Sequence, residues 1–147
     1  MGVGRIKGRS IGLDTVCFIH FIQSHPIYAP VLRSLFREAD SGKRRIVTSA
    51  VTLLEVLVVP YRYGDVALAE RYEALLTQSR GVDLIPIDQA QLRGTAMLRA
   101  RYRLKTPDGL QLSAALSQRC TTFVTNDRPL PAMPGLEILQ LDTLVNT

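Results

Sequence analysis

The chain has 147 residues, a length that fits one domain and leaves little room for a second. Hydrophobic residues make up 46% and the mean hydropathy is +0.10, which excludes an intrinsically disordered chain and predicts a sizeable buried core. The formal net charge of +5 favours encounter with polyanions such as nucleic acid, although a need for solubility explains the same excess.

The cysteines and the first residues indicate where the protein works. Cys17 and Cys120 lie in apolar segments without CxxC spacing or a histidine at metal-binding spacing, so we expect buried reduced thiols and a cytoplasmic protein. Residues 1–9 are basic and glycine-rich but lack the apolar stretch of a signal peptide. We expect them to form a flexible arm ahead of a single domain, residues 10–147. The longest apolar segment, residues 50–61, is too short to cross a bilayer.

In the first half of the chain, short apolar runs alternate with longer segments of helical periodicity. The first run ends at a carboxylate, Asp14, and proline or serine stands where several helices are expected to begin or end. The expected elements are strands at residues 11–14 and 45–48 and helices at residues 15–23, 30–40 and 50–59, the last capped by Ser49 and stopped by Pro60.

The second half continues this alternation, with Asp65 and Asp88 as expected helix caps. Pro86 favours an edge position for the strand that contains it. Strands that alternate with helices predict an α/β fold in which helices cover both faces of a parallel sheet. The expected elements are helices at residues 66–79, 89–103 and 106–118, strands at residues 82–87, 121–125 and 136–141, and a terminal turn from residue 142.

Three aspartates stand where this fold would bring them near one edge of the sheet. Asp14 closes the first strand and Asp127 follows the strand at residues 121–125, so both are expected at the carboxyl edge, where open α/β sheets bind ligands. Asp108 lies in the first turn of a helix. Each also has an ordinary structural explanation: Asp14 fits a helix cap, Asp108 complements a helix dipole, and Asp127 fits a turn.

Glu55 is harder to explain by structure alone. It is the only charged residue between Arg45 and Arg62, and the helix turns on either side of it are apolar. Burying an unpaired carboxylate is costly or forces its protonation, so a buried acid is nearly always paired with a cation. An internal arginine would serve, and a metal ion is the interpretation that we favour.

Several acids gathered at one point repel one another unless a cation lies between them. Mg²⁺ and Mn²⁺ prefer carboxylate oxygens and water, so an acid cluster without histidine or cysteine predicts one of these two ions. Ions of this kind activate water and stabilise a phosphodiester displacement. The acids therefore predict phosphodiester hydrolysis.

Four short motifs, taken together, resemble the PIN domain. Their order and approximate spacing match over residues of about 10 to 142. Gly109 stands where the family commonly has alanine, and glycine early in a helix costs up to about 1 kcal/mol, which hardly affects the assignment. The motifs are Leu13-Asp14-Thr15, Thr48-Ser49-Ala50 leading to Glu55, the run PDGLQLSAA at residues 107–115, and Val124-Thr125-Asn126-Asp127-Arg128.

This resemblance implies a PIN-like three-layer α/β/α sandwich with a short, mainly parallel central sheet. It also implies an Mg²⁺- or Mn²⁺-dependent endoribonuclease that hydrolyses RNA. The size resembles that of VapC-like toxins of type II toxin–antitoxin pairs, which implies a homodimer held by a cognate antitoxin protein.

The resemblance also assigns roles to residues. Asp14 and Asp108 are the expected direct metal ligands. Thr125 would offer its hydroxyl to the site, and Asn126 would help to position the substrate. The full set assigned to metal binding and catalysis is Asp14, Glu55, Asp108 and Asp127.

Basic residues near these motifs are candidates for RNA contacts. Arg128 directly follows the last acid, and Arg99 and Arg103 lie one helical turn apart before Asp108. A solvated helix face explains the latter two equally well. His20 and the histidine at position 25 receive no catalytic role.

Three other functions compete with this interpretation. One is a housekeeping nuclease of RNA maturation with the same fold. Another is a non-catalytic α/β module that binds RNA or protein, in which the acids are only caps and turn residues. The third, a phosphatase or receiver domain, normally needs a second aspartate near Asp14 and a later lysine beside the site, whereas no lysine follows Lys105.

Overall fold

Five short parallel strands form the centre of the computed structural model, which describes residues 2–126 and 128–145. Their order across the sheet is β3-β2-β1-β4-β5, and each neighbouring pair runs parallel. The predicted parallel sheet is confirmed, and the strand before Pro86 lies at its edge as expected. The strands are β1 (Ser10–Leu13), β2 (Arg45–Ser49), β3 (Val82–Ile85), β4 (Thr122–Thr125) and β5 (Glu137–Gln140).

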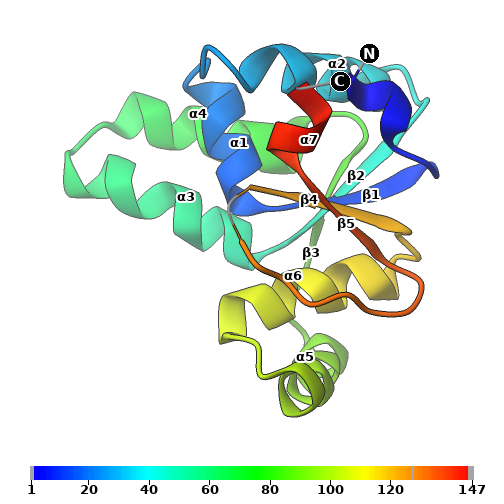
Figure 1. Cartoon of the computed structure of the whole chain (residues 1–147). Coiled ribbons are helices and arrows are strands. Elements are labelled where there is room, and N and C mark those ends of the chain that lie inside the picture. Colours follow the sequence, from blue (N-terminus) through cyan, green and yellow to red (C-terminus); the bar gives the residue numbers. More distant parts are fainter. Residues whose placement is uncertain (1, 127, 146–147) are drawn as a thin grey trace.

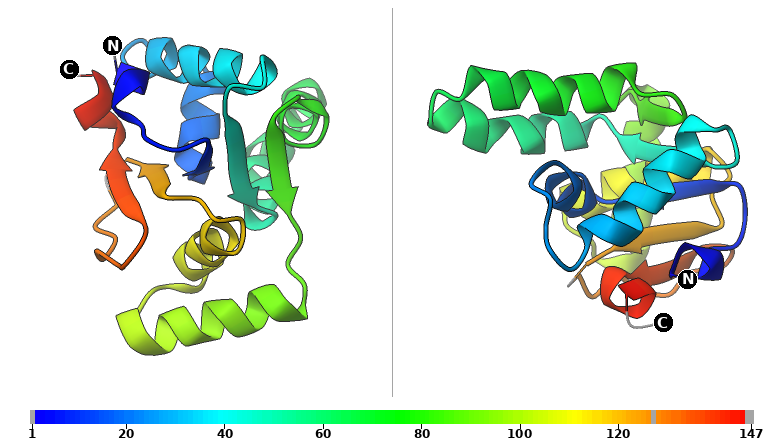
Figure 2. Two further views of the ribbon diagram at one scale, coloured as in Figure 1. Left: turned by 90° about the vertical axis from the view of Figure 1, so that its right-hand side faces the viewer. Right: turned by 90° about the horizontal axis from the view of Figure 1, so that it is seen from above.

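Helices cover both faces of the sheet, as Figures 1 and 2 show. On one side lie α5 and α6, and on the other lie α1, α2 and α7. Two further helices, α3 and α4, form an antiparallel pair that projects from the body of the domain. The helices are α1 (Thr15–Ile22), α2 (Ala29–Asp40), α3 (Val51–Arg62), α4 (Val66–Gln78), α5 (Gln89–Tyr102), α6 (Thr106–Ser117), α7 (Leu141–Val145) and a short 3-10 helix, η1 (Gly2–Arg5).

The core has two parts because successive strand residues point to opposite faces of the sheet. Ile46 and Val124 pack into the cluster beneath α1, α2 and α4. Their strand neighbours Val47 and Phe123 pack into the cluster beneath α6. This alternation confirms the three-layer α/β/α sandwich.

Gly12 allows α6 to approach the sheet closely. A Cβ at this position would lie 2.5 Å from Cδ1 of Phe123 and 3.0 Å from Cβ of Ala115, which is closer than real side chains allow. Without a side chain at position 12, the ring of Phe123 lies across β1. Because α6 carries Asp108 in its first turn, this contact helps to fix the height of that carboxylate above the sheet edge.

Pro60 does not end α3 as we expected, because the helix continues to Arg62. Proline removes one helical N–H and disturbs only the turn before it, a defect that the last turn of a helix tolerates. Ser49, the expected cap, is instead the last residue of β2, although its Oγ accepts a hydrogen bond of 3.2 Å from Val51 N–H. Among the described residues, no helix is long and apolar enough to cross a membrane.

Residues 2–9, expected to form a flexible arm, lie against the domain instead. Ile6 is 3% exposed and belongs to the core. Arg44 holds the segment, because its guanidinium donates to the backbone oxygens of Gly8 at 3.0 Å and Val3 at 3.1 Å. Two apolar residues, Val3 and Ile6, among basic residues and glycines are too weak a pattern to predict such burial.

Candidate active site

The candidate site lies at the carboxyl edge of the sheet, where β1, β2 and β4 end side by side. Asp14 follows β1 and caps α1, because its Oδ1 accepts a hydrogen bond of 2.8 Å from Thr15 N–H. Its Oδ2 accepts a second hydrogen bond, of 2.6 Å, from the hydroxyl of Thr125 at the end of β4. The same carboxylate therefore caps a helix and stands at the edge where a ligand is expected.

Burial controls the ionisation of Asp14. The residue is 5% exposed. The loss of water raises the pKa of its carboxyl group above the ordinary value, although hydrogen bonds from Thr125 and Thr15 and the charge of Arg128 oppose this effect. A positive charge beside Asp14 therefore stabilises the ionised form of this carboxyl group against the cost of burial. Burial and then the charge of Asp14 also raise the pKa of the Cys17 thiol, so this sulfur stays neutral and is no nucleophile.

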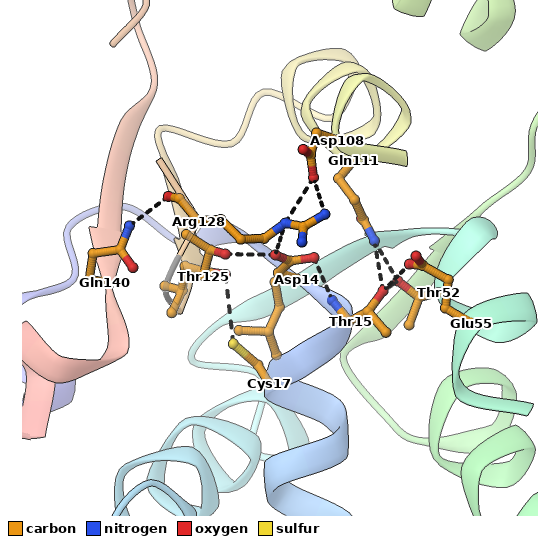
Figure 3. A network of polar contacts seen from close by, with 12 residues as sticks. Asp14, Thr15, Cys17, Thr52, Glu55, Asp108, Gln111, Thr125, Arg128 and Gln140 are labelled. Atoms are coloured by element: carbon orange, nitrogen blue, oxygen red, sulfur yellow. Dashed lines mark hydrogen bonds and ion pairs between the residues drawn. The ribbon is translucent and has the colours of Figure 1, made fainter. Parts of the chain in front are cut away.

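Arg128 supplies the positive charge and joins two of the predicted acids (Figure 3). Its Nε and Nη2 both donate to Oδ1 of Asp108, at 2.9 and 2.6 Å, and its Nε lies 3.6 Å from Oδ2 of Asp14. Partial burial would lower the pKa of Arg128, but the hydrogen bond with Asp108 and the charges of Asp108, Asp14 and Glu55 raise it overall. Three predicted acids therefore act on one cation that belongs to the chain itself.

Asp108 is positioned by the start of α6. Lys105, rather than Thr106, is the residue before the first turn, and Asp108 is the third residue of the helix. The neighbouring glycine, which departs from the family pattern, has a packing reason. A Cβ on Gly109 would lie 2.9 Å from Cγ2 of Thr95, so glycine lets α5 and α6 pack closely.

Glu55 reaches the site from α3, but it is half-buried rather than buried. Our expectation of full burial is wrong because the apolar face around it does not face the core: Val58 and Val59 are 44% and 49% exposed. Oε1 of Glu55 accepts a hydrogen bond of 2.7 Å from the hydroxyl of Thr15. This contact ties the carboxylate to the residue that follows Asp14.

Gln111 on α6 lies at the centre of a buried polar network that sets the position of Thr15 (Figure 3). Its Oε1 accepts a hydrogen bond from the Ser49 N–H at 3.1 Å and lies 3.2 Å from the hydroxyl oxygen of Thr48. Its Nε2 donates to Thr52 at 2.6 Å and to Thr15 at 3.3 Å. One amide thus links α6 to β2, α3 and the start of α1.

The supply of protons sets the direction of these bonds, because each hydroxyl has only one to donate. Thr15 donates to Glu55, and Thr48 lies 2.9 Å from a backbone carbonyl oxygen to which it donates. Thr52 then donates to Thr48 across 2.7 Å. Gln111 fills the remaining acceptor sites of Thr52 and Thr15, so its amide supports the hydroxyl that holds Glu55.

A cavity of about 490 Å³ opens beside these groups and is lined by Asp14, Glu55 and Arg128, among others. Asn126 also lines it, and the Oδ1 atom of this residue is buried without a hydrogen-bond partner among the described residues. A buried acceptor without a donor calls for a ligand or a water molecule. The carboxylates of Asp14 and Glu55 and the amide of Asn126 offer oxygen atoms as metal ligands, the ligand type that Mg²⁺ or Mn²⁺ prefers.

The acids do not form a closed metal cluster by themselves. Within residues 2–126 and 128–145, no three histidine, cysteine or acidic side chains lie together as metal ligands would. Between Asp14 and Asp108 stands the guanidinium of Arg128 instead. Asp127, the fourth predicted acid, lies outside the residues that the structure describes.

The other two predicted basic residues, Arg99 and Arg103, differ in their contacts and in whether they line a hollow. Arg103 follows α5 in the left-handed conformation (φ 56°), and its N–H donates to the carbonyl oxygen of Arg99, one helical turn earlier, at 3.0 Å. Arg99 donates through Nε to the Leu104 carbonyl oxygen at 2.9 Å. Arg103 and Lys105 line a second hollow, of about 370 Å³, together with Asp108 and Arg128.

The sequence model of the PIN domain family matches residues 11–136, which include all of these motifs. The chain belongs to the PIN domain family. Comparison with curated proteins gives no sequence match.

Several solved structures of toxin–antitoxin proteins have a similar fold. DNA-bound VapBC from Salmonella typhimurium shares 23% identity and a TM-score of 0.64, covering 91% of this chain and 99% of that one. VapBC2 from Rickettsia felis, bound to a promoter DNA fragment, shares 18% identity and a TM-score of 0.67, covering 89% and 98%. VapC20 from Mycobacterium tuberculosis, a Sarcin-Ricin loop cleaving toxin, shares 13% identity and a TM-score of 0.62, covering 77% and 86%.

Sequence reasoning missed the part of the site that connects the acids. Gln111 and Thr15 occur in the PIN motifs, but nothing in their spacing shows that they bond to one another. The available signal was Gln111 itself, a long polar residue in an otherwise small and apolar run, LQLSAA. A buried amide of this kind requires several hydrogen-bond partners.

Replacing Gln111 with leucine should destabilise the protein. The change leaves the buried Ser49 N–H without its acceptor, and an unpaired buried group costs about 1–3 kcal/mol. We expect urea unfolding to show a loss of roughly 2 kcal/mol or more in the free energy of unfolding, since the threonine hydroxyls also lose their donor. Gln78→Leu, at an exposed position of α4, is the matched control. Equal unfolding midpoints for Gln111→Leu and wild type would show that the network adds no stability.

Proposed function

We propose that this PIN domain is an endoribonuclease that depends on Mg²⁺ or Mn²⁺. The observation that carries the proposal is the Asp14–Arg128–Asp108 cluster, with Glu55 acting on the same guanidinium. Carboxylates that share one cation at the edge of a cavity can also hold a divalent ion, the cofactor that this kind of phosphodiester hydrolysis uses. The proposed metal-binding and catalytic residues are Asp14, Glu55, Asp108 and Asp127, of which Asp127 is carried over from the PIN motif alone.

A divalent ion held by these carboxylates would supply Lewis-acid chemistry, activating water and offsetting the charge of the phosphodiester. The residues of the chain prepare this site. Thr125 holds the carboxylate of Asp14 in one orientation, and Thr15 does the same for Glu55. The unpartnered Oδ1 of Asn126 is suited to accept a hydrogen bond from a water molecule or from a ribose hydroxyl of the substrate.

Cations beside the acids would bind the RNA backbone. Arg128, when it leaves Asp108, and Arg103 in the neighbouring hollow are placed to pair with phosphates on either side of the cleaved bond. Arg99 is the weaker candidate because its Nε already bonds to a backbone carbonyl. Two buried thiols without a disulfide and an RNA substrate both fit the cytoplasmic location expected from the sequence.

Within this activity, we favour the toxin of a type II toxin–antitoxin pair over a housekeeping nuclease. The chain covers almost the full length of toxins solved in complex with antitoxins or their DNA, such as 99% of the Salmonella typhimurium chain. A similar fold occurs in a toxin that cleaves the Sarcin-Ricin loop, which is RNA. A cognate antitoxin is therefore the proposed protein partner.

Cleavage should depend on the acids and on the metal ion. We expect the purified protein to cut structured RNA with Mg²⁺ or Mn²⁺ and to stop when EDTA is added. Asp14→Asn and Asp108→Asn should each reduce the rate at least about 100-fold, because they remove proposed ligands without creating a cavity. Asp65→Asn is the matched control, since Asp65 caps α4 away from the site and asparagine caps equally well. Wild-type rates in both site variants would remove the proposed function.

Arg128 should compete with the metal ion for the same carboxylates. If so, Arg128→Gln will bind Mn²⁺ roughly tenfold more tightly than wild type, because a positive charge next to Asp14 and Asp108 has been removed. Isothermal titration calorimetry measures this affinity without any need for activity. Arg103→Gln removes the same charge from the neighbouring hollow and serves as the control. Weaker Mn²⁺ binding by Arg128→Gln would show that the arginine supports the metal site.

A stripe of exposed apolar residues on α3 supports the proposed homodimer. Leu54, Val58 and Tyr61 recur at helical spacing and are 65%, 44% and 61% exposed. Apolar surface gathered in this way marks a protein interface, and an apolar stripe on one helix can pair with the same stripe of a second copy across a two-fold axis.

Light scattering should give about twice the chain mass of 16.3 kDa for the wild-type protein. Leu54→Glu should shift the protein to the monomer, because a charge is placed in the contact. Ile27→Glu is the control, because Ile27 is 59% exposed but lies in the turn between α1 and α2, outside the stripe, and this variant should stay dimeric. A monomeric wild type would contradict the homodimer and leave the stripe to the antitoxin.

A further inference from the structure

The cavity that contains the acids also has a wall of a different chemistry. Three residues of α1, Val16, Ile19 and His20, line the same space as Asp14 and Arg128. Positions 16, 19 and 20 lie on one stripe of the helix, running from its capped start toward its last turn. The cavity therefore joins a charged end to an apolar and aromatic surface.

His20 is part of a cluster of three rings. Its ring centroid lies 4.6 Å from that of His25 and 4.9 Å from that of Tyr28. The rings of His25 and Tyr28 are themselves 4.6 Å apart. These separations are those of packed aromatic pairs, and His20 is the member of this ring cluster that lines the cavity.

The turn after α1 holds this cluster of three rings in place. Ser24 has a positive φ of 51°, and His25 N–H donates to the carbonyl oxygen of His20 at 2.9 Å. The ring nitrogen Nδ1 of His25 accepts backbone N–H groups from Ile27 at 3.2 Å and Tyr28 at 3.3 Å. The hydroxyl of Tyr28 donates to Asp142 on α7. The rings behind His20 are thus fixed before a ligand arrives, which lowers the entropic cost of binding.

We propose that the His20 ring is a stacking subsite for a nucleobase of single-stranded RNA, next to the phosphodiester that is cut. The inference rests on the proposed function, which places that phosphodiester at the acids. His20 is six residues from Asp14 along α1, or about 9 Å at 1.5 Å per residue, roughly the reach of one nucleotide. Single-stranded RNA is commonly recognised by bases that stack on aromatic side chains, histidine included.

The composition of the cavity favours a nucleotide over a peptide side chain. A nucleotide is an anion joined to a flat apolar ring, and the cavity places Arg128 and an aromatic wall within one space of about 490 Å³. That volume suits a ligand of this size. An acidic residue of a partner protein would meet Arg128 but would leave the ring of His20 unused.

An abasic scan of a short oligo(A) tests the proposal. One residue at a time is replaced by an abasic ribose, and the affinity of the full chain is measured by fluorescence anisotropy with Ca²⁺, to limit cleavage. In wild type, one position should weaken binding by about 5- to 100-fold when its base is removed. His20→Phe should keep this pattern, because the ring is retained. His20→Leu, which keeps the packing volume but not the ring, should lose it.

Tyr63→Leu serves as the control, since Tyr63 is 78% exposed at the far end of α3 and should leave the pattern unchanged. An abasic pattern that is the same in His20→Leu and in wild type, or absent from wild type, overturns the subsite. So does a His20→Leu variant that loses affinity only for a protein partner. An abasic pattern in a wild type that never cuts RNA with Mg²⁺ would instead keep the subsite and remove the nuclease.

Discussion

The contact of one arginine with two carboxylates at one edge of a parallel sheet is the interaction on which the rest of this site depends. The sheet brings Asp14 to its carboxyl edge because all strands run in one direction, and α6 brings Asp108 to the same place. Burial is the largest cost of ionising Asp14, the charge of Asp108 adds to it, and the guanidinium of Arg128 meets both carboxylates. Any ion or protein that binds here has to replace this guanidinium or bind beside it. The single positive charge of Arg128 offsets only part of the negative charge of Asp14, Asp108 and Glu55, so the site still attracts a cation.

The fold fixes these groups through contacts between α6 and the sheet. Gly12 lets Phe123 lie across β1, and this sets the distance between α6 and the sheet. Gln111, one turn after Asp108, then bonds to β2 and to two threonines near Glu55. Side chains held by both packing and hydrogen bonds keep one geometry, which metal-dependent chemistry requires. The polar network therefore reaches the cavity through Thr15, and the glycine contact supports the site from within the fold.

Much of the fold could be predicted from local signals, because helix caps and strand-ending carboxylates act through neighbouring residues. Asp65 and Asp88 cap α4 and α5 as expected. The errors arose where distant contacts decide the outcome. The apolar turns around Glu55 suggested burial, yet α3 projects from the domain and exposes Val58. Nothing in the order of residues shows that Arg128 turns toward the acids, because that depends on the path of the chain after β4.

The two cysteines lie on opposite faces of the sheet, Cys17 in the cluster beneath α1 and Cys120 in the cluster beneath α6. Both are nearly unexposed, and burial raises the pKa of Cys120 to about 11, so few of these thiols are ionised at neutral pH. Reagents that require a thiolate will therefore modify them only when a layer of the sandwich opens. Each sulfur therefore reports local opening of its own layer. The labelling rates at the two positions would distinguish local opening on one face of the sheet from local opening on the other.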